Sequence, residues 1–201
     1  MTIAILSLES RVQALLARIG NDTALGARFL NTLSLMEHIG SRKIMASQSR
    51  GGVLNADTLQ HLAEETRHAF FFKRAAEALA GRPLGYDDGD CLAPAQARHY
   101  MARLDARIAR AAKGRSAYLF MSYIVEVRAV WFYKLYDGVL KAGSRSLKLT
   151  SLLAEEKSHL AGMRAQLAAL GQESQLAAFS AHENKLFTRL LDGLETAARP
   201  A

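Results

Sequence analysis

The distribution of proline constrains this chain more than any other feature of its sequence. Its 201 residues include three prolines, Pro83, Pro94 and Pro200, so residues 1–82 and 95–199 contain none. Proline is the strongest helix breaker, because it lacks a backbone N–H and its ring clashes with the preceding turn. The proline-free stretches are rich in Ala, Leu, Arg and Glu, which favour helix. The sequence therefore predicts an all-α protein with long helices.

Glycines and capping residues divide the chain into about seven helices. We expect four long ones, at about 23–50, 57–80, 116–141 and 145–170, with a further helix at each end of the chain. The first two long helices are joined by a short turn, and so are the last two. The crossover 81–114 contains a loop and a helix that Pro94 would open. Two hairpins joined by a long crossover predict a single four-helix-bundle domain over residues 1–201, and not an up-down-up-down bundle.

Composition and charge exclude several classes of protein. The single cysteine, Cys91, excludes an internal disulfide and a thiolate-based zinc or iron–sulfur site, and it favours a reducing compartment. The most apolar stretch, 117–136, contains Glu126, Arg128 and Lys134, which argues against a membrane-spanning helix. Residues 1–20 lack the basic start and the cleavage site of a signal peptide. We therefore expect a cytoplasmic protein without a membrane segment.

An internal repeat carries the residues with the clearest chemical meaning. The segment 62–68, LAEETRH, recurs as LAEEKSH at 153–159. Each copy places a glutamate three residues before a histidine, as Glu65 with His68 and Glu156 with His159. Residues at i and i+3 share a helix face, so each pair can bind one side of a metal ion. Two such pairs in matching repeats on two helices are much stronger evidence than one.

The other two long helices each offer one carboxylate at a suitable height. Glu37 is the only acidic residue in 23–50, whereas 116–141 contains Glu126 and, near its end, Asp137. Residues equidistant from the turn of an antiparallel hairpin lie at the same level. The midpoint of 37 and 65 falls in the first turn, and the midpoint of 126 and 156 falls beside the second. Four carboxylates and two imidazoles should therefore converge at one level of the bundle.

The surroundings of these carboxylates call for a cation. Glu37 and Glu126 both lie among apolar residues, where an unpaired carboxylate costs several kcal/mol. Four carboxylates brought together would also repel one another and take up protons. Two divalent cations would resolve both problems, and mixed carboxylate and imidazole ligands suit iron or manganese better than calcium or magnesium. One alternative is a buried salt-bridge network with Arg67, Arg128 and Arg164; another is a bundle that has lost its metal.

This pattern resembles the ligand set of the ferritin-like di-iron carboxylate superfamily, over roughly residues 23–170. The resemblance implies two iron ions, or manganese, bridged by Glu65 and Glu156, with more terminal roles for Glu37 and Glu126. It also implies an oxidoreductase that activates oxygen or peroxide, but it does not select a subfamily. The absence of a rubredoxin-type cysteine set excludes a complete rubrerythrin. The six expected metal ligands are Glu37, Glu65, His68, Glu126, Glu156 and His159.

Neighbours of these ligands are candidates for supporting roles. Glu64 and Glu155 precede the bridging glutamates, and the family resemblance implies that each accepts a hydrogen bond from the ligand histidine of the opposite repeat. Solvation of both acids is the alternative. His61 shares the face of the first pair and is a candidate for an extra ligand, but a surface or packing role is the more common one for such a histidine. Tyr123 and Tyr133 are weak candidates for redox or supporting residues, and a core role is expected for each.

The net charge of +7 leaves the partner open. On the crossover helix, Arg103, Arg107 and Arg110 share a face, for which we favour a solvated surface over a docking site for RNA or another polyanion. A homodimer is expected. Besides oxygen activation on a small molecule with an electron donor, three other functions fit the pattern. They are a tRNA-modifying hydroxylase, non-enzymatic iron handling (a ferroxidase or iron store), and a structural bundle with a vestigial site.

Overall fold

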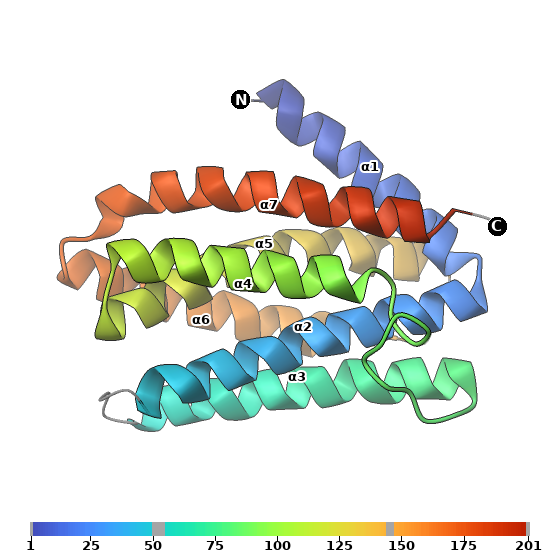
Figure 1. The fold of residues 1–201 in the computed structure, drawn as a ribbon, viewed down its shortest axis with the longest axis horizontal. Helices are drawn as coiled ribbons and strands as arrows, with labels where there is room; N and C mark the ends of the chain where they lie inside the picture. Colours follow the sequence, from blue (N-terminus) through green and yellow to red (C-terminus); the bar gives the residue numbers. More distant parts are fainter. Residues whose placement is uncertain (1, 50–54, 144–146, 200–201) are drawn as a thin grey trace.

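The structure, a computed structural model, describes residues 2–49, 55–143 and 147–199. Within these ranges it is all-helical, as predicted, and contains no strand. Figure 1 shows the helices running mostly side by side, with α1 inclined away from the others. The elements in chain order are α1 (Thr2–Gly20), α2 (Thr23–Ser49), α3 (Ala56–Ala80), α4 (Pro94–Ala111), α5 (Gly114–Ala142), α6 (Thr150–Ala169), the 3-10 turn η1 (Glu173–Gln175) and α7 (Leu176–Ala197).

Two helix pairs form the frame that positions the site. The helix α2 packs along α3, and α5 packs along α6. The crossover helix α4 packs against α2, α5 and α7, so it covers one side of the frame. The four long helices predicted from the sequence therefore exist as two hairpins, and the crossover contains the predicted loop and helix (Figure 1).

The fourth long helix starts later than predicted. The sequence predicted a start at 145, but α6 begins at Thr150. The three residues before it are not helical, because Leu147 and Leu149 pack into the core from this segment and Leu149 is fully buried there. The first predicted turn, residues 51–52, and residue 144, predicted to cap the fourth helix, both lie outside the described residues.

Helix ends follow local capping chemistry. The Asn55 side chain accepts a hydrogen bond from the backbone N–H of Thr58 and so opens α3. Gly81 ends α3 with a φ of 67°, a left-handed conformation that glycine adopts without strain. Pro94 occupies the first turn of α4, as predicted.

The crossover loop is tied to α2 by buried polar side chains. The Asn31 amide donates to the backbone carbonyls of Gly85 and Asp90, at 2.6 and 2.9 Å. The Thr32 hydroxyl lies 2.8 Å from both the N–H and the carbonyl oxygen of Leu92. These bonds satisfy loop groups that would otherwise be buried without partners, and they fix the start of α4 against α2.

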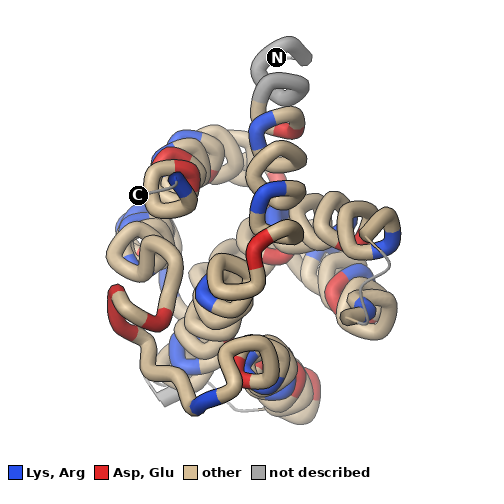
Figure 2. The backbone as a smooth tube through the Cα atoms, turned by 90° about the vertical axis from the view of Figure 1, so that its right-hand side faces the viewer, with Lys and Arg blue, Asp and Glu red and all other residues tan. Residues whose placement is uncertain are grey.

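Acidic and basic residues are both distributed along the helices, as Figure 2 shows. Among the described residues, no helix combines the length and the apolar character needed to cross a membrane.

Candidate metal centre

The four predicted carboxylates converge inside the molecule. Glu37 on α2, Glu65 on α3, Glu126 on α5 and Glu156 on α6 are at most 8% exposed. Together with histidines of α3 and α6 they form two adjoining groups, each with ligand atoms within 4.8 Å of one another. We name the first group site 1 and the second site 2. Site 1 consists of Glu37, Glu65, His68 and Glu156, and site 2 consists of His61, Glu126 and His159.

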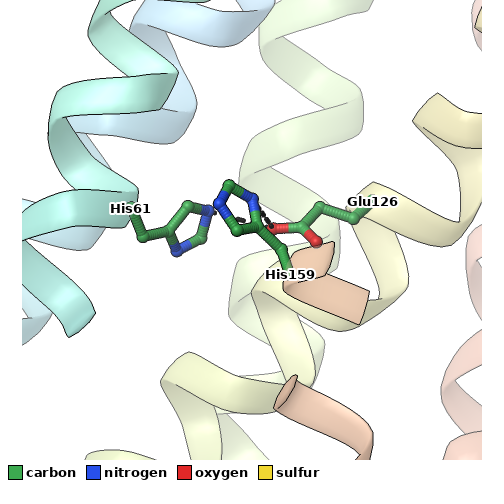
Figure 3. A group of neighbouring side chains, drawn as sticks. All are labelled: His61, Glu126 and His159. Carbon is green, nitrogen blue, oxygen red and sulfur yellow. Dashed lines mark ion pairs between the residues drawn. The ribbon is translucent and has the colours of Figure 1, made fainter. Parts of the chain in front are cut away.

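Each of the six residues predicted as ligands thus belongs to either site 1 or site 2. Site 2 is drawn in Figure 3, where the rings of His61 and His159 both lie beside the carboxylate of Glu126. Nε2 of His61 is 2.9 Å from Oε1 of Glu126, and Nδ1 of His159 is 3.7 Å from the same oxygen. The two sites adjoin, since Nε2 of His61 is also 3.4 Å from Oε1 of Glu65.

His61 is the site residue that the sequence analysis did not assign. A surface or packing role was expected, but the side chain is 4% exposed and belongs to site 2. The available signal was its spacing of four residues before Glu65 and seven before His68, which places all three on one face of α3. The repeat hid this signal, because the equivalent position in α6 is Leu152.

The three imidazoles share one arrangement. One ring nitrogen of each is bound by a supporting group: Nδ1 of His61 by the Tyr118 hydroxyl at 2.7 Å, Nε2 of His68 by Glu155 at 2.8 Å, and Nε2 of His159 by Glu64 at 2.5 Å. The other nitrogen of each ring is buried, has no hydrogen-bond partner and lies near the carboxylates of its site. Such an outer bond fixes the tautomer and the direction of a metal-binding imidazole.

The contacts of Glu64 and Glu155 cross between the two repeats. Glu64 on α3 accepts from His159 on α6, and Glu155 on α6 accepts from His68 on α3. Both contacts of the predicted symmetric pair are therefore present. A carboxylate only accepts, so Nε2 of each histidine donates, and Nδ1 is the ring nitrogen that faces the site and would bind a metal after losing its proton. Support of a bound metal by these acids stays a prediction.

Buried oxygen atoms of the sites also lack partners. Both carboxylate oxygens of Glu126 and Oε2 of Glu156 are buried without a hydrogen bond. Buried polar atoms are almost always satisfied, and a cluster of unsatisfied ones calls for a missing partner. The atoms concerned are imidazole nitrogens and carboxylate oxygens that face one another, which is the donor set of a metal site.

Arginine does not neutralise this cluster. Among the described residues, the only groups ion-paired with the four carboxylates of the two sites are histidines. The three arginines considered for a salt-bridge network bind elsewhere: Arg67 pairs with Glu155, Arg128 with Glu183, and Arg164 with Glu173. The geometry therefore disfavours a buried arginine–carboxylate network as the reason for these glutamates.

In the metal-free protein, protons balance the charge of the cluster. Burial and the nearby carboxylates raise the pKa of Glu37 well above its ordinary value, and burial raises the pKa of Glu126 to about 8 despite its contact with His61. Burial lowers the pKa of His61 and His68, but neighbouring carboxylates outweigh it and raise these pKa values to about 12 and about 10. The four carboxylates therefore stabilise positively charged groups within the cluster.

The two candidate tyrosines differ. The Tyr133 hydroxyl donates a hydrogen bond to Oε1 of Glu37, so it supports site 1 directly. Tyr133 is also buried, and burial raises its pKa well above the ordinary value. Tyr123 is half-buried and forms no hydrogen bond within the described part of the chain. The hydroxyl that contacts His61 instead belongs to Tyr118, which the sequence analysis did not single out.

Gly40 allows the close approach of α2 to Glu65. A Cβ atom at this position would lie 2.8 Å from Oε2 of Glu65, inside van der Waals contact. The conflicting atom is the end of a flexible side chain, so alanine here would displace the carboxylate and leave the helices in place. The small residue therefore fixes where one ligand of site 1 can lie.

We expect Gly40→Ala to weaken metal binding without unfolding the protein. Moving Glu65 from its place should cost about 10-fold in metal affinity, as loss of a supporting contact does in other metal sites. Gly162→Ala is a matched control, because it also replaces a helical glycine and its Cβ would have open space. Both variants gain helix propensity, of roughly 1 kcal/mol at most. Metal titrations of the two variants compare them, and equal affinities would contradict the role given to Gly40.

Loss of either supporting acid should weaken metal binding as well. We expect Glu64→Ala and Glu155→Ala each to lower metal affinity by roughly 10- to 100-fold, because the opposite imidazole loses its orientation. Glu64→Gln can still accept the bond from His159 through its amide oxygen, so its effect should be smaller. Circular dichroism checks that the fold is retained. Unchanged affinity in both alanine variants would show that these acids act only as solvated residues.

The basic residues of the crossover helix are on the surface. Arg103, Arg107 and Arg110 are all exposed on α4, and the Arg107 guanidinium lies 5.9 Å from the ring centre of Phe179. This arrangement fits a solvated face, and an RNA or polyanion partner stays a prediction.

No protein-family model, curated protein or solved structure matches this chain.

Proposed function

We propose that this protein is a ferritin-like four-helix-bundle protein that binds two iron ions and acts as an oxidoreductase toward oxygen or peroxide. Manganese is the alternative metal. The observation that carries the proposal is the shared arrangement of the three imidazoles: one nitrogen of each is hydrogen-bonded to a supporting group, and the other faces the site carboxylates without a hydrogen bond. Packing or ion pairing alone gives no reason for this arrangement to occur three times around four buried carboxylates.

Site 1 would hold one ion and site 2 the other. Site 1 offers three carboxylates and one imidazole, and site 2 offers one carboxylate and two imidazoles. Oxygen and imidazole ligands of this kind suit iron and manganese. Glu65 lies between the sites, since its carboxylate contacts His61 of site 2. A bridging role for Glu65 is therefore supported by position, and the repeat suggests the same for Glu156.

Bound iron would supply the redox chemistry, and the chain's own residues would control it. The carboxylates of Glu64 and Glu155 hold the proton on the outer nitrogen of each opposite imidazole, so the inner nitrogens stay free to bind. Tyr133 orients Glu37 by donating to it from within the core. The site carboxylates and His61 and His68 are buried, and burial strengthens the charge interactions between them.

The proposal is tested by metal analysis and oxygen consumption. Protein purified without added metal should contain close to two iron or manganese ions per chain, with an optical spectrum distinct from haem. After reduction, the iron-loaded protein should consume oxygen, and a Glu37→Gln, Glu126→Gln double variant should not. Protein that binds no metal stoichiometrically would overturn the proposal. Metal-loaded protein inert toward both oxygen and peroxide would leave a structural or storage site.

A further inference from the structure

A large cavity connects the candidate metal centre with the surface. Its volume is about 800 Å³, and residues of α2, α3, α4 and α5 line it. His61, Glu65 and Glu126 line its inner end, so it reaches both sites. Cavities of roughly 300–1,000 Å³ are the usual size for binding small organic molecules.

A second cavity at the centre is too small for such a molecule. It measures about 70 Å³ and is lined by the four carboxylates of the two sites, by Arg128 and Tyr133, and otherwise mostly by apolar side chains. A water molecule occupies about 30 Å³ in the liquid, so this space suits only the smallest molecules. An organic ligand would therefore approach through the large cavity, on the side of His61 and Glu126.

The walls of the large cavity are apolar between its two ends. Side chains of α2, α4 and α5 form this middle part: Ile39, Ile44, Met101, Ala117, Met121 and Val125. Among the named lining residues, Asp105 is the only carboxylate away from the inner end, and its Oδ2 is 2.6 Å from Nζ of Lys43. In that ion pair the charges of Asp105 and Lys43 neutralise each other.

Two further cations line the cavity. Arg42 is exposed and has no ion pair or hydrogen bond within the described residues. Arg115 is exposed and binds only the neutral side-chain oxygen of Gln166, at 2.5 Å. The end of α2 and the start of α5 lie at the same end of the molecule (Figure 1). Arg42 and Arg115 both line the cavity, and among the described residues no carboxylate is paired with either.

We propose that this cavity binds an amphipathic organic acid, which is the substrate class of the metal centre. The apolar body would lie along α5, and the carboxylate would bind Arg42 and Arg115. Guanidinium groups bind carboxylates through two parallel hydrogen bonds. Eleven residues separate Arg115 from Glu126, so the span along the helix is roughly 16 Å at 1.5 Å per residue. The binding part stands on the cavity alone, and the assignment as substrate rests on the proposed function.

Binding of model acids tests the inference. Decanoate, 4-butylbenzoate and indole-3-acetate are titrated into the metal-loaded protein by calorimetry, with decanol as the neutral probe. At least one acid should bind saturably below about 1 mM, and decanoate should bind more tightly than decanol. In the Arg42→Gln, Arg115→Gln double variant, affinity for the acid should fall about 10-fold or more, while affinity for decanol changes little. Arg110→Gln is the control, because this exposed arginine does not line the cavity.

The outcomes separate this inference from the proposed function. Neither guanidinium touches the metal sites, so the double variant should keep the full metal content. If none of the three acids binds, or if the double variant binds them as tightly as the wild type, the inference is wrong while the metal assignment stands. If the protein binds no metal but still binds acids through both arginines, the binding part holds and the role as substrate fails. If the apolar part of the bound acid reaches the inner end of the cavity, binding should also alter the spectrum of the cobalt-loaded protein. No spectral change would overturn the placement of the apolar part beside the metal centre.

Discussion

Glu156→Ala is expected to remove both metal ions from the protein. Glu156 is 1% exposed, and its carboxylate belongs to site 1 and lies 3.1 Å from Nδ1 of His68. Its loss removes one ligand from site 1. Because its predicted role is to bridge the two ions, its loss also removes negative charge that would balance the ion in site 2. Glu65→Ala should act in the same way, because Glu65 contacts residues of both sites. Elemental analysis after purification measures the result, and full occupancy in either variant would contradict the assignment.

A third substitution distinguishes the two sites. His61→Ala removes one of the three ligands of site 2 and none of site 1. We expect this variant to retain about one ion per chain, where the bridging variants retain almost none. A loss of both ions, or of neither, would show that His61 does not belong to site 2 as a ligand.

Glu183→Gln is the control for damage to a buried glutamate. Glu183 is 3% exposed, binds Arg128 and Tyr100, and belongs to neither metal site. Its loss should destabilise the fold, because Arg128 would lose a buried partner. The folded fraction should nevertheless keep the full metal content. Metal loss equal to that of Glu156→Ala would mean that general destabilisation explains both results.

Chelation of the metal should lower the melting temperature of the wild-type protein by about 10 °C. An ion that binds only the folded state stabilises it by roughly 4 kcal/mol at a thousand times its Kd. For a chain of this length, each kcal/mol corresponds to about 2–4 °C. The Glu37→Gln, Glu126→Gln double variant lacks one ligand in each site, so chelation should hardly change its melting temperature. Calorimetric scans with and without a chelator provide the measurement.

The metal-free proteins should show the opposite order of stability. Burial raises the pKa of Glu37 and Glu126, so at neutral pH the fold must either keep them protonated or bury their charge. Groups whose pKa is raised by folding cost stability as the pH rises above the ordinary carboxyl pKa. Neutral glutamine removes this cost. The metal-free double variant should therefore be at least as stable at neutral pH as the metal-free wild type. A similar response of both proteins to the chelator would show that these glutamates are not ligands.

Local sequence determined the helices and most of the candidate site. The absence of proline over residues 1–82 and 95–199 favoured long helices. The described residues form helices joined by loops and contain no strand. The i, i+3 spacing of Glu65 with His68 and of Glu156 with His159 is a property of any helix, so it predicted their shared faces. The family resemblance implied the crossed contacts of Glu64 and Glu155, and the repeat made the two contacts equivalent, so that both or neither should be present.

Tertiary packing alone decided the remaining features. His61 belongs to site 2 because α5 brings Tyr118 and Glu126 to either side of its ring, and neither residue is its neighbour in sequence. The helix α6 starts at Thr150, after Leu149, which is fully buried in the core. Helix propensity does not predict this packing. The large cavity is enclosed by residues of α2, α3, α4 and α5 that are distant in sequence. The residue pattern along a single helix does not predict the space enclosed between several helices. That space determines which molecules can reach the metal centre.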